Sequence, residues 1–209
     1  MAECMARGNL LRLVSTGLSL LAAGSCSWRL DVTNRDSQGT AVICFGDSLT
    51  VGVGASPGHD YPSLLAARLG RAVINAGVSG DTTRDAVRRL EADVLARDPR
   101  LVIVQFGGND FLQQLSREET FADLETIVRR IQERGAMVVL VGVQPGLIGD
   151  PTRRDYRRIA RARGAVFVPN ILEGILTTPQ LKSDQLHPND AGYEKIAERI
   201  ARAVEPLLE

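Results

Sequence analysis

The sequence is poor in the residue types that hold metals or disulfides and that stack on ligands. Aromatic residues make up 4% of its 209 residues, and its three cysteines form no CxxC pair and no zinc-site spacing. The sequence therefore predicts neither a disulfide framework nor a zinc site, and we expect no metal and no cofactor. Only two histidines, His59 and His187, are available to any reaction that needs an imidazole base.

An excess of charge of one sign is also missing. Lys and Arg total 25, as do Asp and Glu, so the formal net charge is zero, and nothing in it favours nucleic acid as a partner. Six arginines between residues 153 and 163 are a local exception, which we interpret as the solvated face of a helix. A hydrophobic share of 44% over this length is typical of one globular domain with a buried core.

The N-terminal region has no run of the about 20 apolar residues that a membrane-spanning helix needs. Arg7 and Arg12 precede a shorter apolar or small-residue stretch, 13–23, and Gly24-Ser25-Cys26 follows. This order predicts that residues 1–26 are a secretory signal. The stretch also resembles a bacterial lipoprotein signal, in which the cysteine, here Cys26, becomes lipidated.

Three alternatives stay open for this leader: a lipoprotein signal, an ordinary cleaved signal, or a frayed cytosolic tail. We expect export to the periplasm, with a membrane tether where Cys26 carries a lipid. Residues 27–39 are polar and are interpreted as a linker. Residues 40–209 are expected to form the folded domain, as a monomer.

From residue 40 onward, short apolar runs alternate with helical patterns. The expected strands are 40–45, 72–74, 101–106, 136–141 and 165–168. The expected helices are 61–69, a stretch around 87–95, 117–134, 152–163 and 191–207. Strands and helices in alternation with short links predict a parallel sheet covered on both faces, a three-layer α/β/α domain. Cys44, within the first strand, is expected to be a small buried residue.

Four polar turns interrupt this alternation, and the first three of them follow strands. They are Gly46-Asp47-Ser48, Ser79-Gly80-Asp81, Gly108-Asn109-Asp110, and the segment from Asp184 to His187. Because parallel strands bring their carboxyl ends to one edge of the sheet, these turns are expected to converge there.

Together these turns hold the parts of a serine-based reaction. Ser48 is a weak nucleophile unless a base accepts its proton. His187 can be that base, and Asp184, three residues earlier, can fix its tautomer. His59 has only an adjacent carboxylate, Asp60, which is badly placed to orient it. The backbone N–H groups of Gly80 and Ser48 and the side-chain amide of Asn109 are candidate donors to a developing oxyanion.

Gly46-Asp47-Ser48-Leu49, Gly80, Gly107-Gly108-Asn109-Asp110 and Asp184-x-x-His187-Pro188, in this order, resemble the motifs of the GDSL, or SGNH, hydrolases. The resemblance covers about residues 40–207 and is greatest to the multifunctional thioesterase/arylesterase/lysophospholipase type of the bacterial periplasm. It implies a flavodoxin-like sheet of about five parallel strands. It also implies Ser48 as nucleophile, His187 as base, Asp184 as its orienter, and Ser48, Gly80 and Asn109 as the oxyanion hole. Asp47, Asp81 and Asp110 are interpreted as residues that hold the site.

Apolar residues follow the same turns and suggest the substrate class. The residues expected to form a groove for an acyl chain are Phe111, Leu112, Val143, Pro145 and Leu186. An equally good interpretation is that these residues make ordinary core and lid contacts. With a groove, the predicted reaction is hydrolysis of carboxylic esters: aryl esters, short- to medium-chain acyl esters, thioesters or lysophospholipids.

Two other functions stay open. The same triad could remove acetyl groups from carbohydrates, although the low aromatic content leaves few residues to stack on a sugar. A non-catalytic, flavodoxin-like module that binds phosphate or flavin is the other, and an intact Ser48, Asp184 and His187 argue against it. The pair Gly52 and Gly54 is no dinucleotide loop, because Pro57 stands where the third glycine belongs.

Overall fold

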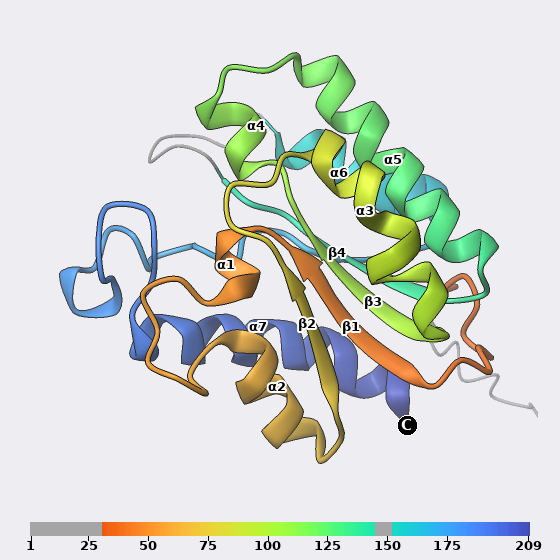
Figure 1. Cartoon of the computed structure of the whole chain (residues 1–209), viewed down its shortest axis with the longest axis horizontal. Helices are drawn as coiled ribbons and strands as arrows, with labels where there is room; N and C mark the ends of the chain where they lie inside the picture. Colours follow the sequence, from red (N-terminus) through yellow and green to blue (C-terminus); the bar gives the residue numbers. More distant parts are fainter. Residues whose placement is uncertain (1–30, 145–151) are drawn as a thin grey trace, which may run out of the picture.

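A computed structural model of the chain describes residues 31–144 and 152–209 (Figure 1). Its centre is one parallel sheet of five strands in the order β2-β1-β3-β4-β5. The strands are β1 (Ala41–Gly46), β2 (Val73–Gly77), β3 (Pro99–Gln105), β4 (Met137–Val141) and β5 (Val166–Val168). This is the strand order of flavodoxin-like domains, so the predicted sheet is confirmed.

Seven α-helices and two 3-10 turns connect and cover the strands within the described residues. The α-helices are α1 (Ser48–Val51), α2 (Tyr61–Leu69), α3 (Thr83–Asp93), α4 (Gly108–Leu112), α5 (Arg117–Glu133), α6 (Arg153–Arg163) and α7 (Asp190–Leu208). The 3-10 turns are η1 (Leu95–Arg97) and η2 (Pro179–Leu181). None of these helices is long and apolar enough to cross a membrane.

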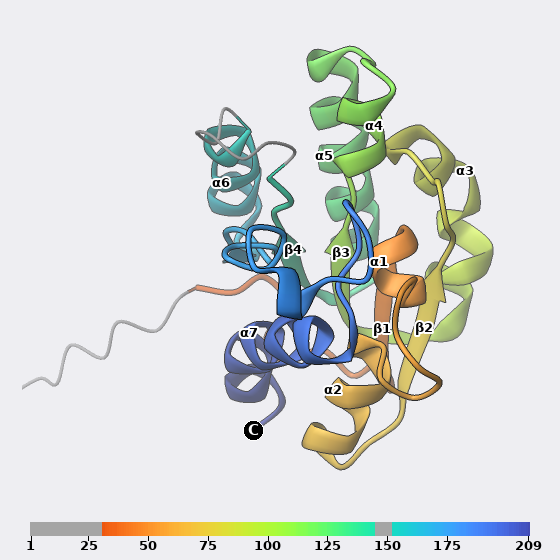
Figure 2. The same cartoon turned by 90° about the vertical axis from the view of Figure 1, so that its left-hand side faces the viewer.

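The sheet separates two apolar layers, because alternate strand residues point to opposite faces. Val42, Cys44 and the residues level with them pack against α2 and α7. Ile43, Phe45 and their neighbours pack against α3, α5 and α6, and Figures 1 and 2 show α2 and α7 on the side opposite α3 and α5. The continuous apolar runs of β1, β3 and β4 are therefore explained by burial on both faces.

The segment before β1 is part of this folded unit. Val32 is buried, the Thr33 N–H donates to the Gly164 carbonyl at 2.9 Å, and the Asn34 side chain donates to the carbonyls of Gln132 and Ala136. The described part of the predicted linker, residues 31–39, is thus packed against the domain. Its short polar side chains donate to carbonyls near the ends of α5 and α6 that have no partner within the helix. Residues 27–30 lie outside the described residues.

The carboxyl ends of β1, β2 and β3 meet at one edge of the sheet. There the connection from β1 runs to β2 on one side, whereas the connection from β3 runs to β4 on the other side. Such a switch point is where open α/β sheets bind ligands. The turns that carry Ser48, Gly80 and Asn109 all begin at this edge.

Candidate active site

Ser48 is the first residue of α1, directly beyond β1. Gly46 permits the sharp turn, because any side chain there would collide with Thr50 and Gln105. The Leu49 N–H donates to Asp47 Oδ1 at 3.0 Å, so Asp47 caps the short helix. Gly46 and Asp47 therefore help to hold Ser48 half-buried at the edge of the sheet.

His187 lies between Ser48 and Asp184, although 139 residues separate it from Ser48. Its Nε2 is 3.1 Å from Ser48 Oγ, and its Nδ1 is 2.8 Å from Asp184 Oδ2. The hydrogen bond from His187, and then the Leu186 N–H, hold the pKa of Asp184 down at about 2. An ionised Asp184 favours the tautomer in which Nδ1 carries the proton and Nε2 can accept one from Ser48.

The loop that carries His187 is shaped by its own polar residues. Asp184 Oδ1 accepts from the N–H groups of Leu186 and His187, at 2.7 and 2.8 Å. The Ser183 N–H donates to the His187 carbonyl at 3.0 Å, and Asn189 then caps α7 by accepting from the Gly192 N–H. Asp184 therefore has two tasks: it closes the turn with one oxygen and contacts the imidazole with the other.

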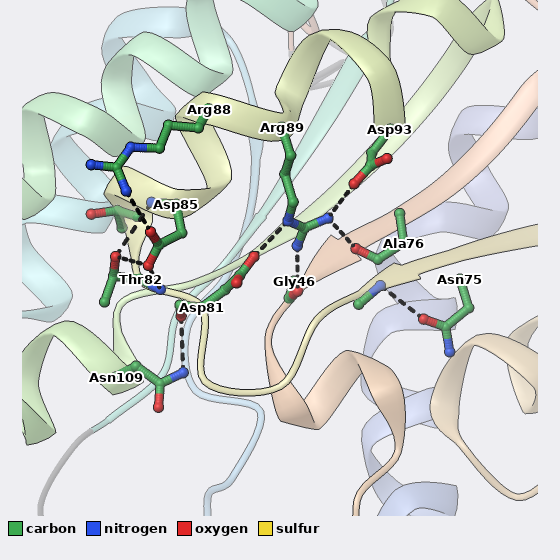
Figure 3. A network of polar contacts seen from close by, with 12 residues as sticks. Gly46, Asn75, Ala76, Asp81, Thr82, Asp85, Arg88, Arg89, Asp93 and Asn109 are labelled. Atoms are coloured by element: carbon green, nitrogen blue, oxygen red, sulfur yellow. Dashed lines mark hydrogen bonds and ion pairs between the residues drawn. The ribbon is translucent and has the colours of Figure 1, made fainter.

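Gly80 and Asn109, which carry candidate oxyanion donors, line the same cavity as Ser48 and His187. Gly80 lies between β2 and α3 with φ +87°, a conformation that favours glycine. Asn109, in the first turn of α4, donates from Nδ2 to the Asp81 carbonyl at 2.9 Å (Figure 3). Because an amide NH₂ has two hydrogens, Asn109 keeps a second donor for a ligand.

The cavity beside Ser48 measures about 340 Å³ and is lined mainly by apolar side chains. Three of the five predicted groove residues, Leu112, Val143 and Leu186, line it. Phe111 does not: it is 50% exposed and absent from the lining, because adjacent helix residues point about 100° apart. The prediction that Phe111 belongs to the groove is therefore wrong. Pro145 lies outside the described residues.

Four further apolar residues line this cavity and are not among the predicted groove residues. They are Leu49, Val53, Leu172 and Leu176. Leu172 and Leu176 belong to the irregular stretch between β5 and α7, where no periodic pattern indicates which side chains face the site.

The carboxyl group of Asp47 is buried directly beside this machinery and is only 3% exposed. Burial raises its pKa from 3.8 to about 6, against the opposing effects of the Leu49 N–H, Gln105 and His187. Folded Asp47 thus keeps its proton to a higher pH than unfolded Asp47 does, because removal of the charge from water disfavours the carboxylate.

We expect Asp47→Asn to remove the part of the pH dependence of folding stability that comes from Asp47. Folded Asp47 binds its proton more tightly than unfolded Asp47, so its contribution is full below about pH 4 and is lost as the pH rises through about 6. The difference in pKa corresponds to about 3 kcal/mol. Urea unfolding of both proteins at about pH 4 and pH 7 measures this contribution. Between pH 4 and pH 7 the parent is expected to lose stability relative to the variant. An unchanged difference between the two proteins would contradict the assignment.

Among residues 31–144 and 152–209, no cluster of three or more His, Cys, Asp or Glu could hold a metal ion. A flavodoxin-like sheet with a serine, a histidine and an aspartate joined at its carboxyl edge is the arrangement of a serine hydrolase. The profile of the GDSL-like lipase/acylhydrolase family matches residues 44–195. The chain therefore belongs to the GDSL-like lipase/acylhydrolase family.

Known members of similar sequence are bacterial hydrolases. Esterase TesA of Pseudomonas aeruginosa is 27% identical over 91% of this chain and 99% of its own. Thioesterase 1/protease 1/lysophospholipase L1 of Escherichia coli K12 is 28% identical, over 85% and 89%. The arylesterase of Vibrio mimicus is 30% identical, over 77% and 86%. The crystal structure of TesA superposes with a TM-score of 0.75 at 27% identity, covering 80% of this chain and 99% of TesA.

Proposed function

We propose that this enzyme hydrolyses carboxylic esters with short- to medium-chain acyl groups through an acyl-enzyme on Ser48. The observation that carries the proposal is the 3.1 Å approach of His187 Nε2 to Ser48 Oγ at the wall of an apolar cavity. Ser48 is the nucleophile, His187 the general base, and Asp184 the residue that orients His187.

The proposed reaction has two halves. Ser48 Oγ attacks the ester carbonyl carbon while its proton passes to His187 Nε2. The carbonyl oxygen becomes an oxyanion and accepts hydrogen bonds from the Ser48 and Gly80 N–H groups and the Asn109 amide. His187 then protonates the leaving alcohol or thiol, which departs. Water, deprotonated by His187, attacks the acyl-enzyme in the same way and releases the carboxylic acid.

The lining of the cavity supports an acyl chain as its occupant. Seven aliphatic side chains surround it, and the volume of about 340 Å³ limits the length of chain that can be buried. Aryl esters, acyl thioesters and lysophospholipids are the proposed substrates. The names of the relatives, which include an arylesterase and a thioesterase/lysophospholipase, support this range.

We expect Leu176→Trp, which fills part of the cavity, to shorten the preferred acyl chain. Each buried CH₂ contributes about 0.8 kcal/mol, so the exclusion of two lowers kcat/KM for p-nitrophenyl octanoate roughly tenfold. The value for p-nitrophenyl acetate stays nearly constant. Leu115→Trp is the matched control, because Leu115 is 44% exposed and does not line this cavity.

A series of p-nitrophenyl esters from acetate to palmitate tests the proposal on parent and variants alike. If Leu176→Trp changes no chain-length preference while Leu115→Trp behaves like the parent, the cavity is not the acyl site. Turnover of acetate alone, with faster release of acetate from acetylated xylan, would instead favour the carbohydrate O-acetyl esterase.

We propose further that the enzyme is exported, on the pattern of residues 7–26, and that Cys26 carries a lipid anchor. Expressed in a Gram-negative host, the full chain is expected in the membrane fraction and to take up radiolabelled palmitate. Cys26→Ala is expected to take up none and to lose the membrane association. Equal fractionation of the two proteins would rule out the anchor, and retention of both in the cytoplasm would rule out export.

A further inference from the structure

Arg89 of α3 connects the segments that surround the candidate oxyanion hole (Figure 3). Its side chain is only 17% exposed. Nε donates to the Asp81 carboxylate at 2.5 Å, Nη2 to the Gly46 carbonyl at 2.9 Å, and Nη1 to the Ala76 carbonyl and the Asp93 carboxylate, both at 2.9 Å. One guanidinium therefore joins the end of β1, the end of β2 and the loop that follows β2.

Two aromatic rings also lie beside the guanidinium. Its central carbon lies 4.4 Å from the ring centroid of Phe45 and 5.7 Å from that of Phe106. Cation–π contacts of this kind are favourable when the cation is removed from water. A planar group fixed by two rings and four polar acceptors has little freedom to move, so the acceptors keep fixed positions relative to one another.

These acceptors connect to the proposed oxyanion donors. Gly46, which accepts from Nη2, stands two residues before Ser48 in the same turn. Asp81, which accepts from Nε, directly follows Gly80, and its carbonyl accepts from the Asn109 amide at 2.9 Å. Arg89 is thus linked through Asp81 to Gly80 and Asn109, and through Gly46 and Asp47 to Ser48.

The Gly80 turn has few other supports. Gly80 is exposed, and the space where a Cβ would lie has no neighbour within 4 Å. The Val78 N–H donates to the Gly46 carbonyl at 3.0 Å, and the Asp81 N–H donates to Val78 at 3.3 Å. The side chain that fixes the far end of the turn is that of Asp81, whose partner is Arg89.

We propose that Arg89 is a positioning residue that holds the Gly80 N–H and the Asn109 amide in register with Ser48. The proposal rests on the proposed function, because it assigns Arg89 to the stabilisation of that reaction's oxyanion. Arg89 touches no substrate; it acts through Asp81 and Gly46. Lysine cannot take its place, because a single ammonium nitrogen cannot serve acceptors that lie in four directions.

The test compares Arg89→Lys with Arg88→Lys, since Arg88 is the adjacent residue of α3. Arg88 is 71% exposed and pairs with Asp85 on the outside of the helix (Figure 3). With p-nitrophenyl acetate, Arg89→Lys is expected to lower kcat by roughly 10- to 100-fold, somewhat less than the removal of a whole oxyanion donor. KM should change less than about threefold. Arg88→Lys should match the parent.

Coupling to Asn109 separates positioning from general support of the fold. If Arg89 acts through the donors, Arg89→Lys lowers kcat much less in an Asn109→Ala background than in the parent. Full additivity of the two losses would overturn the proposal, as would a parent-like kcat in folded Arg89→Lys. If Arg89→Lys does not fold, by circular dichroism and thermal unfolding, Asp81→Asn replaces it: this variant keeps the carbonyl that Asn109 contacts and weakens the link to Arg89. An unchanged kcat in Asp81→Asn then overturns the proposal.

The parent protein distinguishes the two levels of failure. If the parent hydrolyses no ester at all, the proposed function and the role of Arg89 fall together. If the parent is active and Arg89→Lys is equally active, only the role of Arg89 is overturned.

Discussion

Replacement of Ser48 by alanine is expected to lower kcat for p-nitrophenyl esters by about 10⁴-fold or more. The variant has no nucleophile for the acyl-enzyme, so only the oxyanion donors and substrate binding continue to act on a water attack. KM should change little, because Ser48 Oγ contributes little to the apolar contacts of the cavity. Thermal unfolding should match the parent, since Ser48 is half-buried and the cap of α1 comes from Asp47.

Ser63→Ala is the control for this experiment, because Ser63 is a surface residue of α2 away from the cavity. Steady-state kinetics on both variants give the result directly. Ser48→Ala with more than a tenth of the parent's kcat would refute the covalent mechanism.

Replacement of His187 by alanine is expected to lower kcat by a similar factor. Without an imidazole 3.1 Å from Ser48 Oγ, nothing removes the serine proton during attack or returns a proton to the leaving group. Removal of the base of such a triad costs about as much as removal of its nucleophile. A double variant, Ser48→Ala with His187→Ala, should therefore be little slower than either single variant.

The sequence supplies a matched control for His187. His59 is the other histidine; it is exposed, and its Nδ1 lies 3.4 Å from the Pro57 carbonyl, in a loop away from Ser48. His59→Ala should keep the parent's kcat. Equal losses in the two variants, or losses that multiply in the double variant, would argue against a joint action of Ser48 and His187.

The central strands could be predicted from sequence because burial on both faces demands continuous apolar residues. The predicted spans 40–45, 101–106 and 136–141 differ from β1, β3 and β4 by at most two residues. β2 is three residues longer at its end than predicted. Its residues Asn75, Ala76 and Gly77 pair with β1 at the edge of the sheet, and that pairing, rather than hydrophobicity, makes them a strand.

The residues of the candidate site could be named from sequence because their turns follow strands and because histidine is rare in this chain. The structure places His187 within hydrogen-bond distance of both Ser48 and Asp184; the roles of the three residues stay predictions. The cavity lining could be predicted only in part. Leu172 and Leu176 reach it from an irregular stretch, whose path depends on tertiary contacts.

Arg89 illustrates a second kind of residue that sequence reasoning does not find. It stands next to Arg88 in a charged amphipathic helix, and the sequence around the two arginines does not distinguish one from the other. Only the packed structure shows that Arg88 faces solvent. Arg89, in contrast, lies beside the Gly80 turn and donates to backbone carbonyls at the carboxyl ends of β1 and β2. The difference comes from the position of α3 on the sheet, which no local pattern specifies.

The most direct test of the account is covalent labelling with diethyl p-nitrophenyl phosphate. Attack by a serine oxygen on phosphorus forms a stable diethylphosphoryl ester and releases one p-nitrophenolate. We predict one equivalent of p-nitrophenolate per chain and, by peptide mass spectrometry, a single added diethylphosphoryl group on Ser48. His187→Ala should react far more slowly. A label on another residue, or no label on a folded protein that still hydrolyses esters, would contradict Ser48 as the nucleophile.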